Sequence, residues 1–181
     1  MISIGDLLYA FAQWLKTTPL VEFSLWLSKT PLSEAADKAF WTTPIAQTIH
    51  ILAIAATFGA VGMIVLRIFA LAGTKRTMAE TAERYMPWIW WGLVTLVVTG
   101  IVMIFTDPIR CLMNPAFWSK MILVIALALT SWAFAAAVRR KAAWLELTDG
   151  RRKAVQAAAV GVVVLWCAII AFGRWIAYVP V

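Results

Sequence analysis

The sequence has 181 residues and a net charge of +7 at pH 7, and 63% of its residues are hydrophobic while 14% are charged. Soluble domains usually contain about 25% charged residues and about half apolar residues, so this composition excludes an ordinary soluble domain. The apolar residues are gathered into long runs, each near the roughly 20 residues that a helix needs to cross a bilayer. We therefore expect an integral membrane protein.

Residues 1–42 do not form a membrane span, because charged and polar side chains interrupt their apolar runs. In residues 2–16 the apolar side chains recur at helical spacing, and residues 19–30 repeat this mixture after a break at residues 17–19. Such segments are typical of amphipathic helices that lie in the membrane interface. We expect two of them, either capping one end of the protein or serving a separate binding function.

Four long apolar runs follow, and each predicts a transmembrane helix. A membrane barrel is disfavoured, because its strands alternate apolar and polar residues in segments of about ten. Thr43 and Pro44 provide a helix start for the first span, Pro87 opens the second, and Asp107 closes it. The short connections predict an all-α, up-down four-helix bundle over residues 43–181, with spans at about 44–73, 87–106, 117–138 and 155–179.

The basic residues lie beside the spans, which favours a role in topology over nucleic-acid binding. Two of the connections are rich in Lys and Arg, and the positive-inside rule places both of them in the cytoplasm. Both termini should then face the periplasm, and the expected location is a bacterial inner membrane. The basic positions are Arg67, Lys75, Arg76 and Arg84 in the first group, and Arg139, Arg140, Lys141, Arg151, Arg152 and Lys153 in the second.

Several kinds of activity are disfavoured. No span has an Asp or Glu near its middle, whereas ion-coupled transporters commonly use buried carboxylates. The sequence has no phosphate-binding glycine loop, and its single histidine has no obvious serine or cysteine partner for hydrolysis. These absences favour a protein that is not an enzyme.

His50, the sole histidine, lies in the first span on a face of small or polar residues. At 100° per residue, His50 shares this face with Ala46, Gln47, Ala53 and Thr57, and Gln47 is a further candidate for cofactor contact. The face should point into the bundle or into a subunit interface, with His50 about two turns inside the outer end. His50 is therefore a candidate metal ligand; the alternative is a histidine that only donates a hydrogen bond to a neighbouring helix.

Met103 and Met121 are expected within about one turn of the depth of His50. Imidazole and thioether groups both bind haem iron, and electron-transfer cytochromes use them as a pair. Lys120 and Arg174 lie near the same outer boundary and could neutralise haem propionates. The sequence therefore predicts a haem b site, although methionines also suit plain apolar packing and the two cations could instead reach the lipid headgroups.

The haem hypothesis leaves three arrangements of iron ligands open. His50 could be the sole protein ligand, Met103 or Met121 could complete the site, or His50 residues of two subunits could share one haem, which requires a homo-oligomer. We expect a haem or similar hydrophobic cofactor near the periplasmic side and a role in electron transfer. The alternatives are a non-redox scaffold or accessory subunit of a larger membrane complex, and a carrier for an apolar small molecule.

The runs PIAQTIHILAIAATFGAV, PWIWWGLVTLVVTGIVMIFTDP and NPAFWSKMILVIALAL resemble an uncharacterised family of bacterial four-helix inner-membrane proteins. The layout is more remotely similar to copper-resistance protein D and to four-helix b-type cytochromes. The resemblance implies that His50 contacts a cofactor, with an acidic residue one turn before it and a second histidine late in the third span. This chain has Gln47 and, around residues 134–138, no histidine, which argues against a haem held by two histidines of one subunit.

Overall fold

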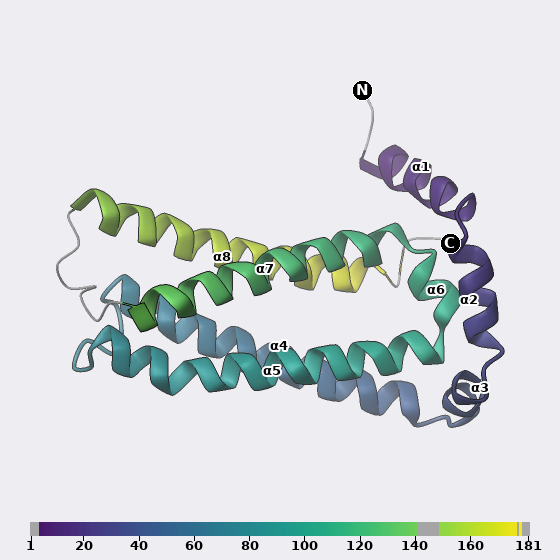
Figure 1. Ribbon diagram of the computed structural model, residues 1–181, viewed down its shortest axis with the longest axis horizontal. Coiled ribbons are helices and arrows are strands. Elements are labelled where there is room, and N and C mark those ends of the chain that lie inside the picture. The colour runs from purple at the N-terminus through teal and green to yellow at the C-terminus, as the bar shows by residue number, and fades with distance from the viewer. Residues whose placement is uncertain (1–3, 141–148, 177, 179–181) are drawn as a thin grey trace.

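The computed structural model describes residues 4–140, 149–176 and 178, and every regular element in them is a helix. Four long helices form a bundle, and four short ones lie at one end of it (Figure 1). The long helices are α4 (Thr42–Ile68), α5 (Met78–Thr106), α7 (Pro115–Arg140) and α8 (Asp149–Trp175). The short helices are α1 (Ile4–Lys16), α2 (Leu20–Ser28), α3 (Pro31–Lys38) and α6 (Pro108–Leu112).

All four long helices contain a stretch that is long and apolar enough to cross a membrane. At most 33% of any of these stretches is buried within the chain, and many of their large apolar side chains are exposed. Outward apolar faces are stable against lipid and costly in water. For the described residues, the predicted all-α fold is confirmed, with four helices that are long and apolar enough to span a membrane.

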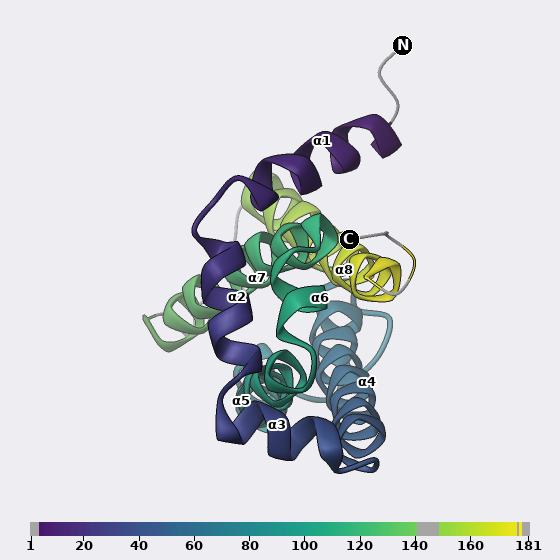
Figure 2. The same ribbon diagram turned by 90° about the vertical axis from the view of Figure 1, so that its right-hand side faces the viewer.

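The N-terminal segment holds three helices where the sequence predicted two. Helix α3 was missed because its sequence has few apolar residues, and it begins instead through local capping. Thr30 accepts a hydrogen bond from the Ser33 amide at 3.4 Å, and Pro31 occupies the first turn. The Ser33 hydroxyl donates to the Phe105 carbonyl at 2.6 Å and so attaches α3 to the end of α5. Helices α1 to α3 run across this end of the bundle (Figure 2).

The second span begins at Met78, so the prediction that Pro87 opens it is wrong. Thr77 caps the helix instead, because its hydroxyl accepts from the Glu80 amide at 3.2 Å while the Glu80 carboxylate accepts from the Thr77 amide at 2.7 Å. This capping box satisfies two amides that would otherwise lack partners. Pro87 lies inside α5 with its ring exposed, where it removes a single helical hydrogen bond.

The first span also differs from its prediction at both ends. Helix α4 starts at Thr42 with Trp41 in the capping position, so the predicted Thr43 cap is wrong. The other end stops at Ile68, because the backbone turns to a φ of 57° at Ala70 and of 66° at Gly73. A positive φ ends a helix, and glycine adopts it at little cost.

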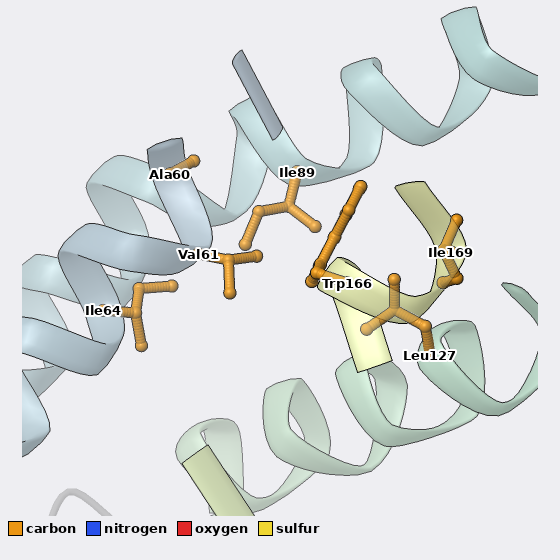
Figure 3. Close-up of a cluster of buried hydrophobic side chains, with 7 residues drawn as sticks. All are labelled: Ala60, Val61, Ile64, Ile89, Leu127, Trp166 and Ile169. Atoms are coloured by element: carbon orange, nitrogen blue, oxygen red, sulfur yellow. The ribbon is translucent and has the colours of Figure 1, made fainter. Parts of the chain in front are cut away.

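A cluster of buried apolar side chains joins the four long helices (Figure 3). Trp166 of α8 is 2% exposed, and the side chains of Ile89 and Leu127 point towards it from α5 and α7. The ring of Phe58, on α4, lies 6.0 Å from the Trp166 ring between centroids. In lipid, such close packing replaces the exclusion of water as the main attraction between helices. The other members are Ala60, Val61, Ile64 and Ile169.

Helices α4 and α5 come close together where Thr57 faces Gly92. Thr57 is fully buried, and its hydroxyl donates to the Ala53 carbonyl at 2.7 Å. A Cβ atom on Gly92 would overlap the Thr57 Oγ1 and lie 3.1 Å from the Thr57 Cβ. Glycine is therefore required here, as is typical where membrane helices approach through small residues.

Replacing Gly92 with alanine should destabilise the bundle by about 1–3 kcal/mol, because the added methyl group overpacks against Thr57. Thermal unfolding of the purified protein in detergent would show a lower midpoint. Gly100→Ala, on the same helix, is the matched control, since its Cβ would meet nothing within 4 Å and the variant should be at least as stable as the parent. Equal midpoints for the two variants would contradict this packing.

Candidate functional site

His50 lies on the buried face of α4, about two turns from the start of the helix. It is 9% exposed, and its Nδ1 lies 2.7 Å from the Thr99 Oγ1 on α5. The Thr99 hydroxyl also lies 2.7 Å from the Thr95 carbonyl, and when it donates its proton there it accepts a hydrogen bond from the imidazole. In that arrangement the imidazole proton is on Nδ1 and the lone pair is on Nε2.

The Nε2 atom of His50 makes no hydrogen bond to any residue that the structure describes. Metal-binding histidines adopt this arrangement, in which one ring nitrogen donates to a protein acceptor and the other is free to bind. Thr99 was not among the residues predicted from the sequence. It lies at the depth of His50 on the next span, and a polar residue at matching depth is the signal that would have singled it out.

Lys120 of α7 contributes a positive charge to the surroundings of this imidazole. Its ammonium group acts electrostatically on both His50 and Cys111, and it lies 3.8 Å from the place that a Cβ on Gly173 of α8 would occupy. Within the described part of the chain, Lys120 has no carboxylate within 4.0 Å and no hydrogen bond. A half-buried cation without an anion is costly, so this position favours a ligand that carries an anionic group.

None of the remaining predicted side chains forms a hydrogen bond with the side chain of His50 or Lys120 in the described part of the chain. Arg174 is exposed and donates from Nη2 to the Tyr178 hydroxyl at 2.8 Å. Gln47 is also exposed, and Met103 is half-buried with its carbonyl oxygen accepting from the Thr106 hydroxyl at 2.9 Å. Met121 packs against a second apolar cluster, formed by Leu27, Leu112, Met113 and Phe117.

The end of the bundle near His50 is closed by buried polar contacts. Helix α7 diverges from α5 towards this end, and α6 bridges the two helices (Figures 1 and 2). Asn114 is fully buried; its side-chain amide donates to the Ile176 carbonyl at 3.1 Å, and its Oδ1 accepts from the Ala116 amide at 2.9 Å. These bonds attach the start of α7 to the end of α8 and fix Lys120 relative to both helices.

Comparison with known proteins identifies one family. A family model described as "Family of unknown function (DUF6644)" matches residues 35–179, which include all four long helices. No curated protein and no solved structure matches the chain. The match agrees with the resemblance to an uncharacterised family, whereas the remoter likeness to copper-resistance protein D and the b-type cytochromes has no support in these comparisons.

The thiol of Cys111 reports on the charges around Lys120. Burial raises the pKa of Cys111 from 9.0 to about 11, the Asp107 carboxylate adds to the rise, and the Lys120 and Arg110 cations oppose it. In a Cys167→Ala background, maleimide labelling of the folded protein at pH 8 should therefore be about a hundredfold slower than in the unfolded chain, because less thiolate is present.

The labelling rate of the folded protein should rise about tenfold per pH unit up to pH 10, whereas the unfolded chain should level off near pH 9. Asp107→Asn, which keeps a capping side chain, should increase the rate, and Lys120→Met should decrease it. A folded-state rate that levels off with the unfolded one would contradict this environment.

Proposed function

This chain belongs to the DUF6644 family of unknown function, and we propose that it binds haem b, or a similar hydrophobic and anionic cofactor, at His50 and serves electron transfer. The proposal rests on two groups that have no protein partner among the described residues. These are the Nε2 atom of His50 and the ammonium group of Lys120. Haem matches both groups, because its iron takes an imidazole nitrogen and its propionates pair with cations.

The residues present fit such a group in distinct roles. His50 would bind the iron through Nε2, and Thr99 would orient the ring by accepting a hydrogen bond from its Nδ1. Lys120 would hold a propionate, and Gly173 leaves room for the ammonium group. When bound, the haem supplies reversible one-electron chemistry. Met103, Met121 or His50 of a second subunit would provide a second iron ligand; otherwise His50 would be the sole protein ligand.

The proposed location is the periplasmic half of a bacterial inner membrane. His50 and Lys120 lie at the end that carries α6, whereas Lys75 and Arg76 lie in the connection at the opposite end of the bundle (Figure 1). The positive-inside rule assigns that basic connection to the cytoplasm. The site then faces the compartment from which periplasmic electron carriers would reach it.

The spectrum of the purified protein tests the haem proposal directly. Protein from haem-replete cells should show Soret and alpha bands that shift on reduction, and His50→Ala should lose them. Gln47→Ala is the matched control, because Gln47 is polar, one turn away and exposed, and this variant should keep the bands. A colourless preparation would remove the haem proposal and leave the accessory subunit and the apolar carrier as candidates.

Paired variants at Thr99 and Lys120 separate a specific loss of haem binding from a general loss of folding. Thr99→Val removes the acceptor for Nδ1 and should weaken haem binding by about 10–100-fold, while Thr99→Ser keeps the acceptor and should retain it. Lys120→Met should also lower haem occupancy, and Lys120→Arg should preserve it. Equal occupancy in Thr99→Val and Thr99→Ser would contradict the positioning role.

We also propose that copies of the chain associate through α8. Ala157, Ala158 and Gly161 are exposed on this helix, and a Cβ on Gly161 would meet nothing within 4 Å. Faces of small residues let membrane helices approach each other closely. Gly161→Leu should reduce the detergent-corrected mass of the purified protein to that of one chain, and an unchanged mass would remove α8 from the interface.

A further inference from the structure

The connection between α4 and α5 forms a pocket at the opposite end of the bundle from His50. Its volume is about 360 Å³, and three cationic side chains line it, those of Arg67, Lys75 and Arg76. The hydroxyl-bearing residues Thr74, Thr81 and Tyr85 also line it. The Arg67 Nε donates to the Arg76 carbonyl at 2.9 Å, which holds the connection around the pocket and leaves the terminal nitrogens of Arg67 available.

The positive charge of this pocket is not neutralised within the described residues. None of its three cations has a carboxylate within 4.0 Å there, and no Asp or Glu lines the pocket. Glu80 acts electrostatically on Arg76, but its carboxylate accepts from the Thr77 amide at 2.7 Å in the capping box of α5. The pocket therefore offers a concentration of hydrogen-bond donors to an anion.

An apolar path leads along α4 into this pocket. Ala55, Gly59, Met63 and Arg67 follow each other at intervals of four residues, so they form one ridge of the helix. Ala55 and Gly59 are exposed, and a Cβ on Gly59 would meet nothing within 4 Å. Met63 and Arg67 line the pocket itself. The ridge therefore has small side chains along the span and ends at the Arg67 cation.

We propose that the pocket binds the phosphate of an anionic phospholipid whose acyl chain lies along the Ala55–Gly59–Met63 ridge. Arginine binds phosphate oxygens in pairs, and basic pockets between membrane helices are known receptors for anionic headgroups. Trp88 and Trp91 of α5 are 62% and 72% exposed within about two turns of Tyr85, as aromatic side chains are near a headgroup region. The apolar ridge favours a lipid over a free phosphate ion.

Native mass spectrometry of the delipidated full chain tests this proposal. We expect phosphatidylglycerol to form a one-to-one complex at lower concentration than phosphatidylcholine with the same acyl chains. Arg67→Gln and Arg76→Gln should each weaken phosphatidylglycerol binding about fivefold, the effect of one interfacial cation. Arg84→Gln is the matched control, because Arg84 is an exposed cation of α5 that does not line the pocket, and this variant should bind normally.

The remaining outcomes distinguish the occupants. Equal affinity for the two lipids, or equal losses in Arg67→Gln and Arg84→Gln, would overturn the proposal. Displacement of the lipid by millimolar inorganic phosphate would identify a site for soluble phosphate instead. Gly59→Phe should weaken lipid binding and leave the protein mass unchanged, whereas a change in oligomeric mass would assign the ridge to a subunit interface. Arg76 is exposed, so Arg76→Gln decides the test if Arg67→Gln does not fold.

Discussion

The contact between the Thr57 side chain and the backbone of Gly92 sets the register of α4 against α5. His50 precedes Thr57 by seven residues on a helix that runs one way, and Thr99 follows Gly92 by seven on a helix that runs the other way. Seven residues are about two helical turns, so the antiparallel helices that touch at Thr57 and Gly92 also bring His50 and Thr99 together. The His50 Nδ1 and the Thr99 hydroxyl oxygen lie 2.7 Å apart. A wider helix pair would separate these groups, so the orientation of His50 depends on the absence of a side chain at Gly92.

Composition was sufficient to predict the four spans, because each apolar run is long enough to cross a bilayer and carries few charges. The ends of the helices were harder to predict, because they depend on local capping contacts. The capping box of Thr77 and Glu80 starts α5 at Met78, nine residues before Pro87. Helical periodicity correctly placed His50 on a buried face, but it contains no information about helix register, so Thr99 was missed. Depth alone also put Arg174 near the site, although Tyr178 holds it at the surface.

The two ends of the bundle differ in how they treat positive charge. Lys120 lies half-buried beside His50, where neighbouring helices limit its contact with water and the closed end holds it in place. The cations of the α4–α5 connection stand in an open pocket and remain accessible. Between them lies the Trp166 cluster, whose indole nitrogen is buried without an acceptor among the described residues, at a cost of about 1–3 kcal/mol. Close packing around the Trp166 ring must offset that cost. The cluster also forms an apolar layer between the two polar regions.

The Thr57–Gly92 and His50–Thr99 contacts both lie within a single helical hairpin, and this has a consequence for biosynthesis. A ribosome completes α4 and α5 before it makes α7 and α8, so the first hairpin can enter the membrane and pack while the rest of the chain is still being translated. The His50–Thr99 contact needs only that first hairpin, whereas Lys120 and Gly173 can join it only after α7 and α8 have been made. The grouping of His50 with Lys120 is therefore complete only when the second hairpin has been added to the first.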